Sequence, residues 1–492
     1  MKASPMTLMN SGAMPLHPAG IQAPAAARPL RLLAVLVSAA VLGGCASFNP
    51  DGGFAAVEKT AKDRLGKDMQ WARSDADQDS IAKRVGELLF KPLTVDDAVQ
   101  VALLNNRGLQ ATFQDLGISE AEVVQAGRLP NPGFSFGRSS RGDEREIERG
   151  LHFNIARLIA MPFIGQMEAR RFEQTKGMVA MSVLSLAADT RKAYYNALAA
   201  EETVRYMRKV KQTADASAEL ARRMEQVGNF NKLQRAREQV FYADASLNLA
   251  RAEQAQRATR ERLTRLLGAW GTQTQFSLPE RLPDLPKDVM ELPDIERVAL
   301  SQRLDVQGAK LAAEQTARNL GLTRTTRFVN VLELGLIRNS SNEEPTQRGW
   351  EIGFELPLFD WGGARVARAE AVYMQTVHRA AETAINARSE VREAYTGYRS
   401  AYDIARHQRD EVVPLNQRIA EENVLRYNGM LIGVFELLAD ARSQIASVNG
   451  SIQALRDFWI AQADLDMALI GKPSLAAAAG PAMAAEAAGA GH

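Results

Sequence analysis

The sequence has almost no cysteine and few aromatic residues. Its 492 residues include one cysteine, Cys45, which excludes a disulfide within the chain and a metal site built on several thiolates. Aromatic side chains make up 6% of the chain, and 60 Lys and Arg against 58 Asp and Glu give a net charge of +2. A protein that binds nucleic acid usually carries a basic surplus, so nucleic acid is not an expected partner.

The sequence also lacks the residue groups that carry catalysis. None of its five histidines forms a pair at the spacing of metal ligands. No nucleophile–base set and no phosphate-binding loop stands out. We therefore expect no enzymatic activity, no metal and no cofactor.

A short apolar run near the N-terminus has the form of an export signal. Arg28 and Arg31 precede the apolar residues 32–42, and the string L-G-G-C ends at Cys45. A basic flank, a short apolar core and small residues are typical of a secretory signal peptide, and the run is shorter than the roughly 20 residues of a spanning helix. L-G-G-C resembles the bacterial lipobox, whose cysteine becomes the lipidated first residue of the mature protein. Ala46 rather than aspartate follows it, and the resemblance then implies an outer-membrane address. The alternative is a buried, unmodified cysteine.

The body of the chain reads as one unit repeated twice. Three strings recur in the same order: R-K-A-Y-Y at 191–195 with R-E-A-Y-T at 392–396, A-R-E-Q at 236–239 with A-R-S-Q at 441–444, and L-L-G at 266–268 with L-I-G at 469–471. Their offsets are 201, 205 and 203 residues. Three ordered matches inside similar helical patterns indicate an internal duplication.

Each half is predicted to begin with a helix, at about 94–127 and 294–325. Two short strands, a very long helix and a returning helix follow. At ~1.5 Å per residue, a helix over 166–226 would be a rod of roughly 90 Å, and 364–427 would give a similar rod. Helices this long pack side by side as coiled coils rather than around one globular core. Pro414 should bend the second rod locally.

Short segments before the long helices alternate apolar and polar residues, the pattern of strands with one apolar face. The segment 328–337 is a fourth candidate that alternates poorly. Polar loops at 138–149 and 339–348 separate the strands and should face the outside, so each half is predicted to hold one β-hairpin. The apolar positions expected to face lipid are Phe134, Phe136, Leu151, Phe153, Ile155, Trp350, Ile352, Phe354 and Leu356.

Strands that are apolar on one side and polar on the other are typical of membrane β-barrels. A barrel needs at least eight strands to close, and open sheet edges are not tolerated in lipid. One chain with four strands therefore cannot make a barrel, whereas several chains can. The alternative is a hairpin that packs on the helices.

In the order of these elements and in several local strings, the chain resembles the outer-membrane factor (TolC-like) family. The resemblance covers about 94–471. It includes P-L-F-D-W-G-G at 357–363 and R-Y-N-G-M-L-I-G-V-F-E-L-L-A-D-A-R at 426–442. It also includes L-T-V-D-D-A-V-Q-V-A-L-L-N-N at 93–106, where Thr94 is a plausible helix N-cap.

This resemblance implies a mainly α fold with a β-barrel contribution. Three chains would form one twelve-stranded barrel in the outer membrane and a helical tunnel through the periplasm. Family members work with a periplasmic adaptor protein and an inner-membrane pump. The segment 51–90, the linker and the C-terminal part would lie near the middle of the tunnel.

We expect the chain to divide into a signal peptide at 1–44, a lipidated segment at 45–92, a first repeat at 93–268, a linker at 269–292, a second repeat at 293–471 and a disordered Ala/Gly-rich tail at 472–492.

The family also implies a gate where the helix turns meet at the periplasmic tip. Tyr427 and Glu436 match family positions there, and Asp440 lies one helical turn after Glu436. Both acids could instead be solvated helix-face residues. Lys232 or Gln234 falls in the first repeat where some members have an acid, so an ionic link is not expected there. The glycines expected to permit tight turns are Gly228, Gly429 and Gly433.

The predicted function is passive conduction of drugs, metal ions or other solutes out of the cell. The alternative is a periplasmic coiled-coil scaffold or an adaptor lipoprotein. A scaffold would have no need for strands with an apolar face in both halves. An adaptor would carry a lipoyl-like β-domain, and none is evident in the sequence.

Overall fold

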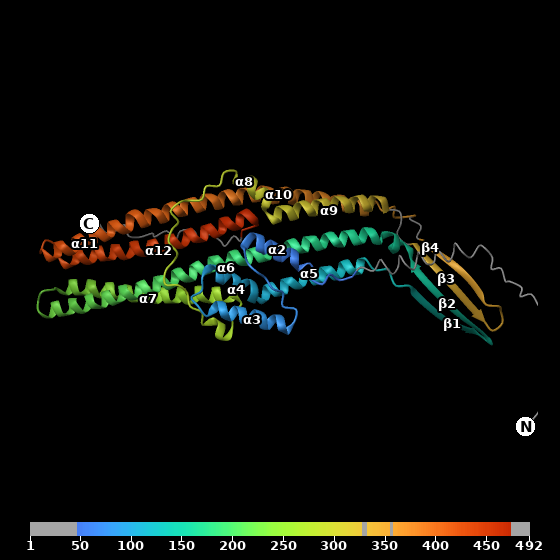
Figure 1. The fold of residues 1–492 in the computed structure, drawn as a ribbon, viewed down its shortest axis with the longest axis horizontal. Coiled ribbons are helices and arrows are strands. Elements are labelled where there is room, and N and C mark those ends of the chain that lie inside the picture. The colour runs from blue at the N-terminus through green and yellow to red at the C-terminus, as the bar shows by residue number, and fades with distance from the viewer. Residues whose placement is uncertain (1–46, 327–331, 355–357, 474–492) are drawn as a thin grey trace, which may run out of the picture.

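The computed structural model describes residues 47–326, 332–354 and 358–473. The molecule is elongated, with a four-stranded sheet at one end and two helical hairpins that reach to the other (Figure 1). Cys45 and the tail beyond 473 lie outside the described residues.

Two short helices precede the first repeat, α2 (Phe54–Leu65) and α3 (Asp75–Leu89). The elements of the first repeat are α4 (Val95–Asn105), α5 (Arg107–Ala126), β1 (Gly133–Arg141), β2 (Glu144–Asn154), α6 (Ile155–Gln226) and α7 (Lys232–Leu267). Thr94 caps α4 as predicted, since its side chain accepts a hydrogen bond from the Asp97 amide. The linker holds one short 3₁₀ turn, η1 (Gly271–Thr274).

The elements of the second repeat follow the same order. They are α8 (Ile295–Gln302), α9 (Leu304–Thr326), β3 (Leu332–Ser341), β4 (Gln347–Phe354), α10 (Gly363–His407), a π-helical turn η2 (Gln408–Val412), α11 (Val413–Asn428) and α12 (Val434–Ile470). The order supports a duplication of helix, hairpin, long helix and returning helix. None of the helices in the described ranges combines the length and the apolar character needed to cross a membrane.

The single helix predicted at the start of each repeat is wrong in both halves, because each is broken once. The breaks fall at Asn106 (ψ 113°) and Arg303 (ψ 126°), which are extended rather than helical. Each residue is held by the end of its own repeat: Asn106 Nδ2 donates to the Leu266 carbonyl at 2.9 Å, and Arg303 Nη1 donates to the Ala468 carbonyl at 3.3 Å. Each break thus satisfies a carbonyl at the end of the returning helix, which has no partner within its own helix.

The long helix α6 has 72 residues and a length of about 110 Å. It starts eleven residues earlier than predicted and runs through Pro162. The corresponding rod in the second repeat is interrupted next to Pro414, where the sequence predicts a bend. Pro414 lacks the amide hydrogen that would pair with the Asp410 carbonyl, and the π-helical turn η2 ends just before it.

The tip turns fix the register between the repeats. Helix α7 begins after its N-cap Asn231 and α12 after Gly433, an offset of 202 residues, and the helices end at Gly268 and Gly471, an offset of 203. The string match at an offset of 205 is therefore out of register by nearly one helical turn and is not evidence of common origin. The match at 203 coincides with the ends of the two returning helices.

All four strands form one antiparallel sheet in the order β1-β2-β3-β4. The polar loop predicted at 138–149 is mostly strand, and the one predicted at 339–348 is half strand, since the hairpin turns occupy only 142–143 and 342–346. The expectation that Ile155 faces lipid from a strand is wrong: Ile155 is the first residue of α6, and Asn154 is its N-cap.

The apolar core lies along the middle of the molecule, where short elements pack on the long helices. Ile81, Val85 and Leu88 of α3 join residues of α6 and Leu278 and Leu282 of the linker in one cluster. Leu285 of the linker packs with residues of α10 and α12 in another. The N-terminal segment and the linker therefore cover the mid-length of the rods, as the family resemblance implies (Figure 1).

Candidate functional site

One face of the sheet is apolar in its half nearest the helices. Directly paired residues of antiparallel strands point to the same side of a sheet. The pairing therefore sets rows of apolar side chains across the strands. The first row is Phe134, Leu151, Leu336 and Trp350, the second is Phe153, Leu334 and Ile352, and the third is Leu332 and Phe354. We call this side of the sheet the apolar face.

The expected lipid-facing positions lie together on the apolar face wherever they are strand residues of the described ranges. These are Phe134, Phe136, Leu151, Phe153, Trp350, Ile352 and Phe354. Trp350 is 70% exposed in the single chain. Leu356 lies outside the described residues. Contact with lipid itself stays a prediction.

The opposite face, which we call the acidic face, carries every glutamate of the described strands. They are Glu144, Glu146, Glu148, Glu333 and Glu351. The strand glycines lie on this face too, and three of them, Gly137, Gly150 and Gly335, make room for larger neighbours. At Gly150 an added side-chain carbon would lie 2.8 Å from His152 Nε2, the atom that pairs with the Ser135 hydroxyl at 2.9 Å.

The strand arginines are divided unequally between the two faces. Arg141 lies on the acidic face, paired across the strands with Glu144. The other five lie on the apolar face, on the side of the hairpin turns: Arg138, Arg145, Arg149, Arg338 and Arg348. This separation is not predicted from the sequence, in which most of these residues have the pattern of loops.

Both outer edges of the sheet are open in the described part of the single chain. Strand β1 pairs only with β2, and β4 pairs only with β3. The four strands have 9, 11, 10 and 8 residues, which approaches the ~9–11 residues of a tilted strand that spans a bilayer. Unpaired edges of this length require another chain if the sheet is to lie in lipid.

Exposed apolar side chains continue past the sheet to the start of the long helices. They are Ile159 and Phe163 of α6 and Leu358, Phe359 and Trp361 before α10. Phe359 is 99% exposed. Aromatic side chains are favoured at the boundary between lipid and water, so these residues extend the apolar surface of the sheet toward the helices.

The far ends of the two hairpins have the same hydrogen-bonded turn. In the first turn the Asn229 amide donates to the Met224 carbonyl at 2.9 Å, and in the second the Leu431 amide donates to the Arg426 carbonyl at 2.9 Å. This is a Schellman motif, which needs one residue with a left-handed backbone. That residue is Gly228 (φ 79°) in the first turn and Met430 (φ 59°) in the second.

The structure therefore assigns different roles to the three predicted turn glycines. Only Gly228 uses the freedom that glycine has. Gly429 adopts φ −80° and Gly433 adopts φ −87°, values open to any residue. The register aligns Gly228 with Met430 rather than with Gly429, and Gly433 with the N-cap Asn231.

The predicted gate residues lie at this tip. Tyr427 is in the last turn of α11 and is 38% exposed. Glu436 is the third residue of α12, while its side chain and that of Asp440 lie outside the described residues. The equivalent residue of α7 is Gln234, whose side chain accepts from the Asn231 amide at 2.8 Å in a capping box. An acid at this position also complements the helix dipole.

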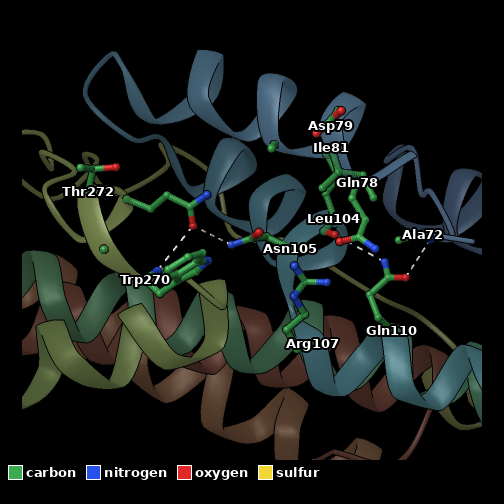
Figure 2. A pocket seen from close by; sticks show the side chains of 13 residues that line it. Ala72, Gln78, Asp79, Ile81, Leu104, Asn105, Arg107, Gln110, Trp270 and Thr272 are labelled. Carbon is green, nitrogen blue, oxygen red and sulfur yellow. Dashed lines mark hydrogen bonds between the residues drawn. The ribbon is translucent and has the colours of Figure 1, made fainter. Parts of the chain in front are cut away.

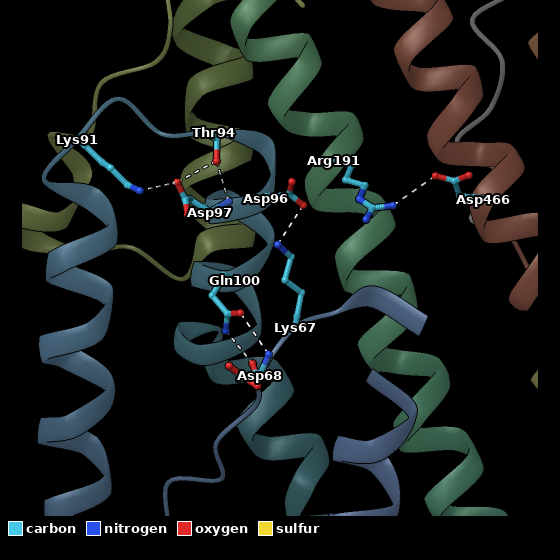
Figure 3. A network of polar contacts seen from close by, with 9 residues as sticks. All are labelled: Lys67, Asp68, Lys91, Thr94, Asp96, Asp97, Gln100, Arg191 and Asp466. Atoms are coloured by element: carbon cyan, nitrogen blue, oxygen red, sulfur yellow. Dashed lines mark hydrogen bonds and ion pairs between the residues drawn. The ribbon is translucent and has the colours of Figure 1, made fainter. Parts of the chain in front are cut away.

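Polar contacts hold the middle of the molecule together (Figure 3). Lys67 pairs with Asp96 at 3.0 Å and joins the N-terminal segment to α4. Arg191 of α6 pairs with Asp466 of α12 at 3.4 Å and joins the two repeats. The side chain of Arg303 is 1% exposed and pairs with Asp305 and Glu390 at 2.7 and 2.6 Å.

Two adjacent tyrosines of α6 lie in the same region. Burial raises the pKa of both phenols, that of Tyr195 to about 12. Tyr194 donates to the Leu93 carbonyl at 2.9 Å, and Tyr195 stacks on Trp459 with ring centroids 5.4 Å apart. The contact with Trp459 gives the two repeats a second link.

A pocket lies beside these contacts, between α3, the start of α5 and the linker (Figure 2). Two of its polar side chains bond other lining residues: Asn105 Nδ2 donates to Gln273 Oε1 at 3.2 Å, and Gln110 Oε1 accepts from the Ala72 amide at 3.0 Å. In the described ranges no three His, Cys, Asp or Glu side chains are close enough to hold a metal ion.

Known proteins are similar to this chain in sequence and in fold. No family model matches the chain. It is 24% identical over 282 residues to the cobalt-zinc-cadmium resistance protein CzcC of Cupriavidus metallidurans, a match that covers 55% of this chain and 64% of that relative. The chain thus spans less than two thirds of the relative's length.

Solved structures give broader coverage. One solved structure is that of CusC, a protein that forms a transmembrane channel. It has a TM-score of 0.64 at 18% identity, and the match covers 79% of this chain and 94% of that chain. The outer membrane channel CmeC of Campylobacter jejuni has a TM-score of 0.67 at 17% identity and covers 76% and 85%. The chain has the fold of the outer-membrane channels. The predicted fold class, a mainly α chain that adds strands to a barrel, is confirmed by this likeness.

Proposed function

We propose that this chain is one subunit of a trimeric exit duct in the outer membrane, which conducts solutes passively from the periplasm to the exterior. It does no bond chemistry. The observation that carries the proposal is the sheet, which has one apolar face, one acidic face and two open edges.

These three properties support a barrel shared between chains. Four strands cannot close, while three copies supply twelve if β1 of each copy pairs with β4 of the next. The apolar face then contacts lipid and the acidic face lines the pore. A scaffold lipoprotein does not explain an exposed apolar sheet with unpaired edges.

The acidic face supports cations as the preferred cargo. Each of its five glutamates would occur three times around the pore, and rings of carboxylates favour cations over anions. The similarity to a protein named for cobalt, zinc and cadmium resistance supports metal ions within this class.

The remaining parts complete an efflux assembly. The helical hairpins form the periplasmic tunnel, and Tyr427, Glu436 and Asp440 lie near its tip, where three copies narrow the pore as a gate. Cys45 carries the lipid anchor. A periplasmic adaptor and an inner-membrane pump deliver the solute, because a passive duct cannot by itself drive a solute against its gradient.

The test uses the full-length protein extracted from membranes and reconstituted into planar bilayers. We expect a trimer that resists heat in detergent and conducts ions. Ile352→Lys should abolish assembly, because Ile352 lies in the middle of the three apolar rows and a charge on the lipid face costs about 2–4 kcal/mol per chain at mid-depth. Glu351→Lys, the neighbouring residue on the opposite face, should still assemble and conduct. A monomer without conductance, or equal behaviour of the two variants, would overturn the proposal.

A further inference from the structure

We propose that the five arginines on the apolar face form a belt that binds the phosphate groups of lipid headgroups in the outer leaflet. The arginine belt consists of Arg138, Arg145, Arg149, Arg338 and Arg348. This inference rests on the proposed barrel, since only a barrel turns this face toward lipid.

The first argument is the row of like charges at the edge of the belt nearest the apolar rows. Arg149, Arg338 and Arg348 are directly paired across three neighbouring strands. Strands lie about 4.8 Å apart, and like charges directly opposite one another repel. Anions that lie beside this row of three guanidinium groups therefore stabilise it.

The described part of the chain does not supply these anions. All described strand glutamates are on the acidic face, and no ion pair of the described ranges includes a belt arginine. Arg149 makes one long side-chain hydrogen bond, to Ser340 Oγ at 3.4 Å, and the other four belt arginines are exposed. The counterions must come from outside the described chain.

The second argument is depth. The belt lies on the hairpin-turn side of the apolar rows, away from the helices. A guanidinium is costly at the middle of the hydrocarbon layer and much less so at its boundary. The apolar rows therefore occupy the hydrocarbon, the exposed residues around Phe359 lie at its boundary on the helix side, and the belt lies at the level of the outer headgroups.

The third argument is the choice of side chain. Apart from His152, every basic residue of the described strands is arginine and none is lysine. Arginine presents a planar fork that binds phosphate oxygens in pairs, whereas lysine acts as a point charge. The belt therefore fits phosphate better than it fits a diffuse cloud of anions.

The experiment measures the melting temperature of the full-length trimer in neutral detergent micelles. The micelles contain phosphatidic acid, diacylglycerol with the same acyl chains, or inorganic phosphate at the same concentration. We expect phosphatidic acid alone to raise the melting temperature, by several degrees. Equal stabilisation by diacylglycerol would show that the acyl chains cause the effect. Equal stabilisation by inorganic phosphate would show that the ligand is a free ion. Either result overturns the proposal.

Variants test the belt directly. The double variant Arg338→Gln, Arg348→Gln should raise the half-effective concentration of phosphatidic acid at least tenfold. The double variant with lysine at both positions should recover only part of the lost affinity. The matched control is Arg141→Gln, which removes an arginine from the acidic face of the same sheet and should leave the lipid response unchanged.

Failure of this inference is distinguishable from failure of the proposed function. Trimers that conduct ions but show no preference for phosphatidic acid would refute the belt and leave the duct intact. A chain that neither trimerises nor conducts would refute the duct itself.

Discussion

Arg303 lies at the break between two helices, carries a buried charge and links three helices. Its guanidinium bonds Asp305, Glu390 and the Ala468 carbonyl, so it joins α9, α10 and the end of α12. The two carboxylates are themselves largely buried, with side chains 19% and 15% exposed. Removing the cation would leave two like charges together in a poorly solvated place.

We predict that Arg303→Met destabilises the protein by about 3 kcal/mol, because loss of one partner of a buried ion pair leaves charge uncompensated. Arg297→Met, which breaks the exposed pair with Asp294, should cost less than about 1 kcal/mol. Thermal unfolding followed by circular dichroism measures both. Equal effects of the two changes would contradict a structural role for the buried pair.

The buried tyrosines predict a loss of stability at alkaline pH. Burial raises the pKa of Tyr195 to about 12 in the folded protein, against about 10 in an unfolded chain. Between these values the unfolded state releases a proton that the folded state keeps. The contribution of Tyr195 to stability is therefore complete below pH 10 and falls by about 1.4 kcal/mol per pH unit as pH rises toward 12, and Tyr194 adds a loss of the same sign.

Tyr195→Phe keeps the ring that stacks on Trp459 and removes the ionisable hydroxyl. We expect this variant to lose less stability than the wild type between pH 10 and 12 in urea titrations. Tyr427→Phe, at the exposed tip, is the control for loss of a phenol and should follow the wild type. An unchanged slope in Tyr195→Phe would assign the alkaline loss to other groups.

Among the elements, the two tip turns offer a comparison within one molecule. They have the same hydrogen bonds, but the left-handed position is glycine in one and methionine in the other. A left-handed backbone costs a residue with a side chain about 1–2 kcal/mol. The second turn therefore stores strain at Met430, in the segment that the proposal assigns to the gate.

We predict opposite effects from two substitutions at this position. Met430→Gly should slow hydrogen exchange of the Leu431 amide about five- to tenfold by relieving strain, and Gly228→Ala should speed exchange of the Asn229 amide by a similar factor. Gly429→Ala should have little effect, because its backbone suits any residue. Equal sensitivity of Gly429 and Gly228 would contradict the alignment of Gly228 with Met430.

Element boundaries also mark the limits of what the sequence predicts. The predicted strands are too short because charged residues such as Arg149 and Glu148 look like a loop, although they alternate between two faces that accept opposite charges. The breaks at Asn106 and Arg303 are not predicted because helical periodicity continues through both. What ends the helices there is contact with the end of another helix, more than 150 residues away in sequence.

For the whole molecule, the separation of charge across the sheet predicts cation selectivity. Replacing Glu148, Glu333 and Glu351 by glutamine should lower the ratio of cation to anion permeability severalfold, as measured by reversal potentials in a salt gradient. Ser140→Ala, on the apolar face, is the control. Raising ionic strength from 0.1 to 1 M shortens the Debye length from about 10 to about 3 Å and should weaken the wild-type preference. Selectivity that the three glutamines leave intact would locate the filter elsewhere.

The sequence alone determined the long helices, the two hairpins, their duplication and the apolar side of the strands, because these follow from local periodicity. It also identified Cys45 as a predicted lipid anchor, a prediction that lies outside the described residues. Tertiary structure decided the helix breaks, the register of the tips and the placement of all five belt arginines opposite the strand glutamates. These depend on pairing and packing between residues far apart in the chain, and no local pattern contains that information.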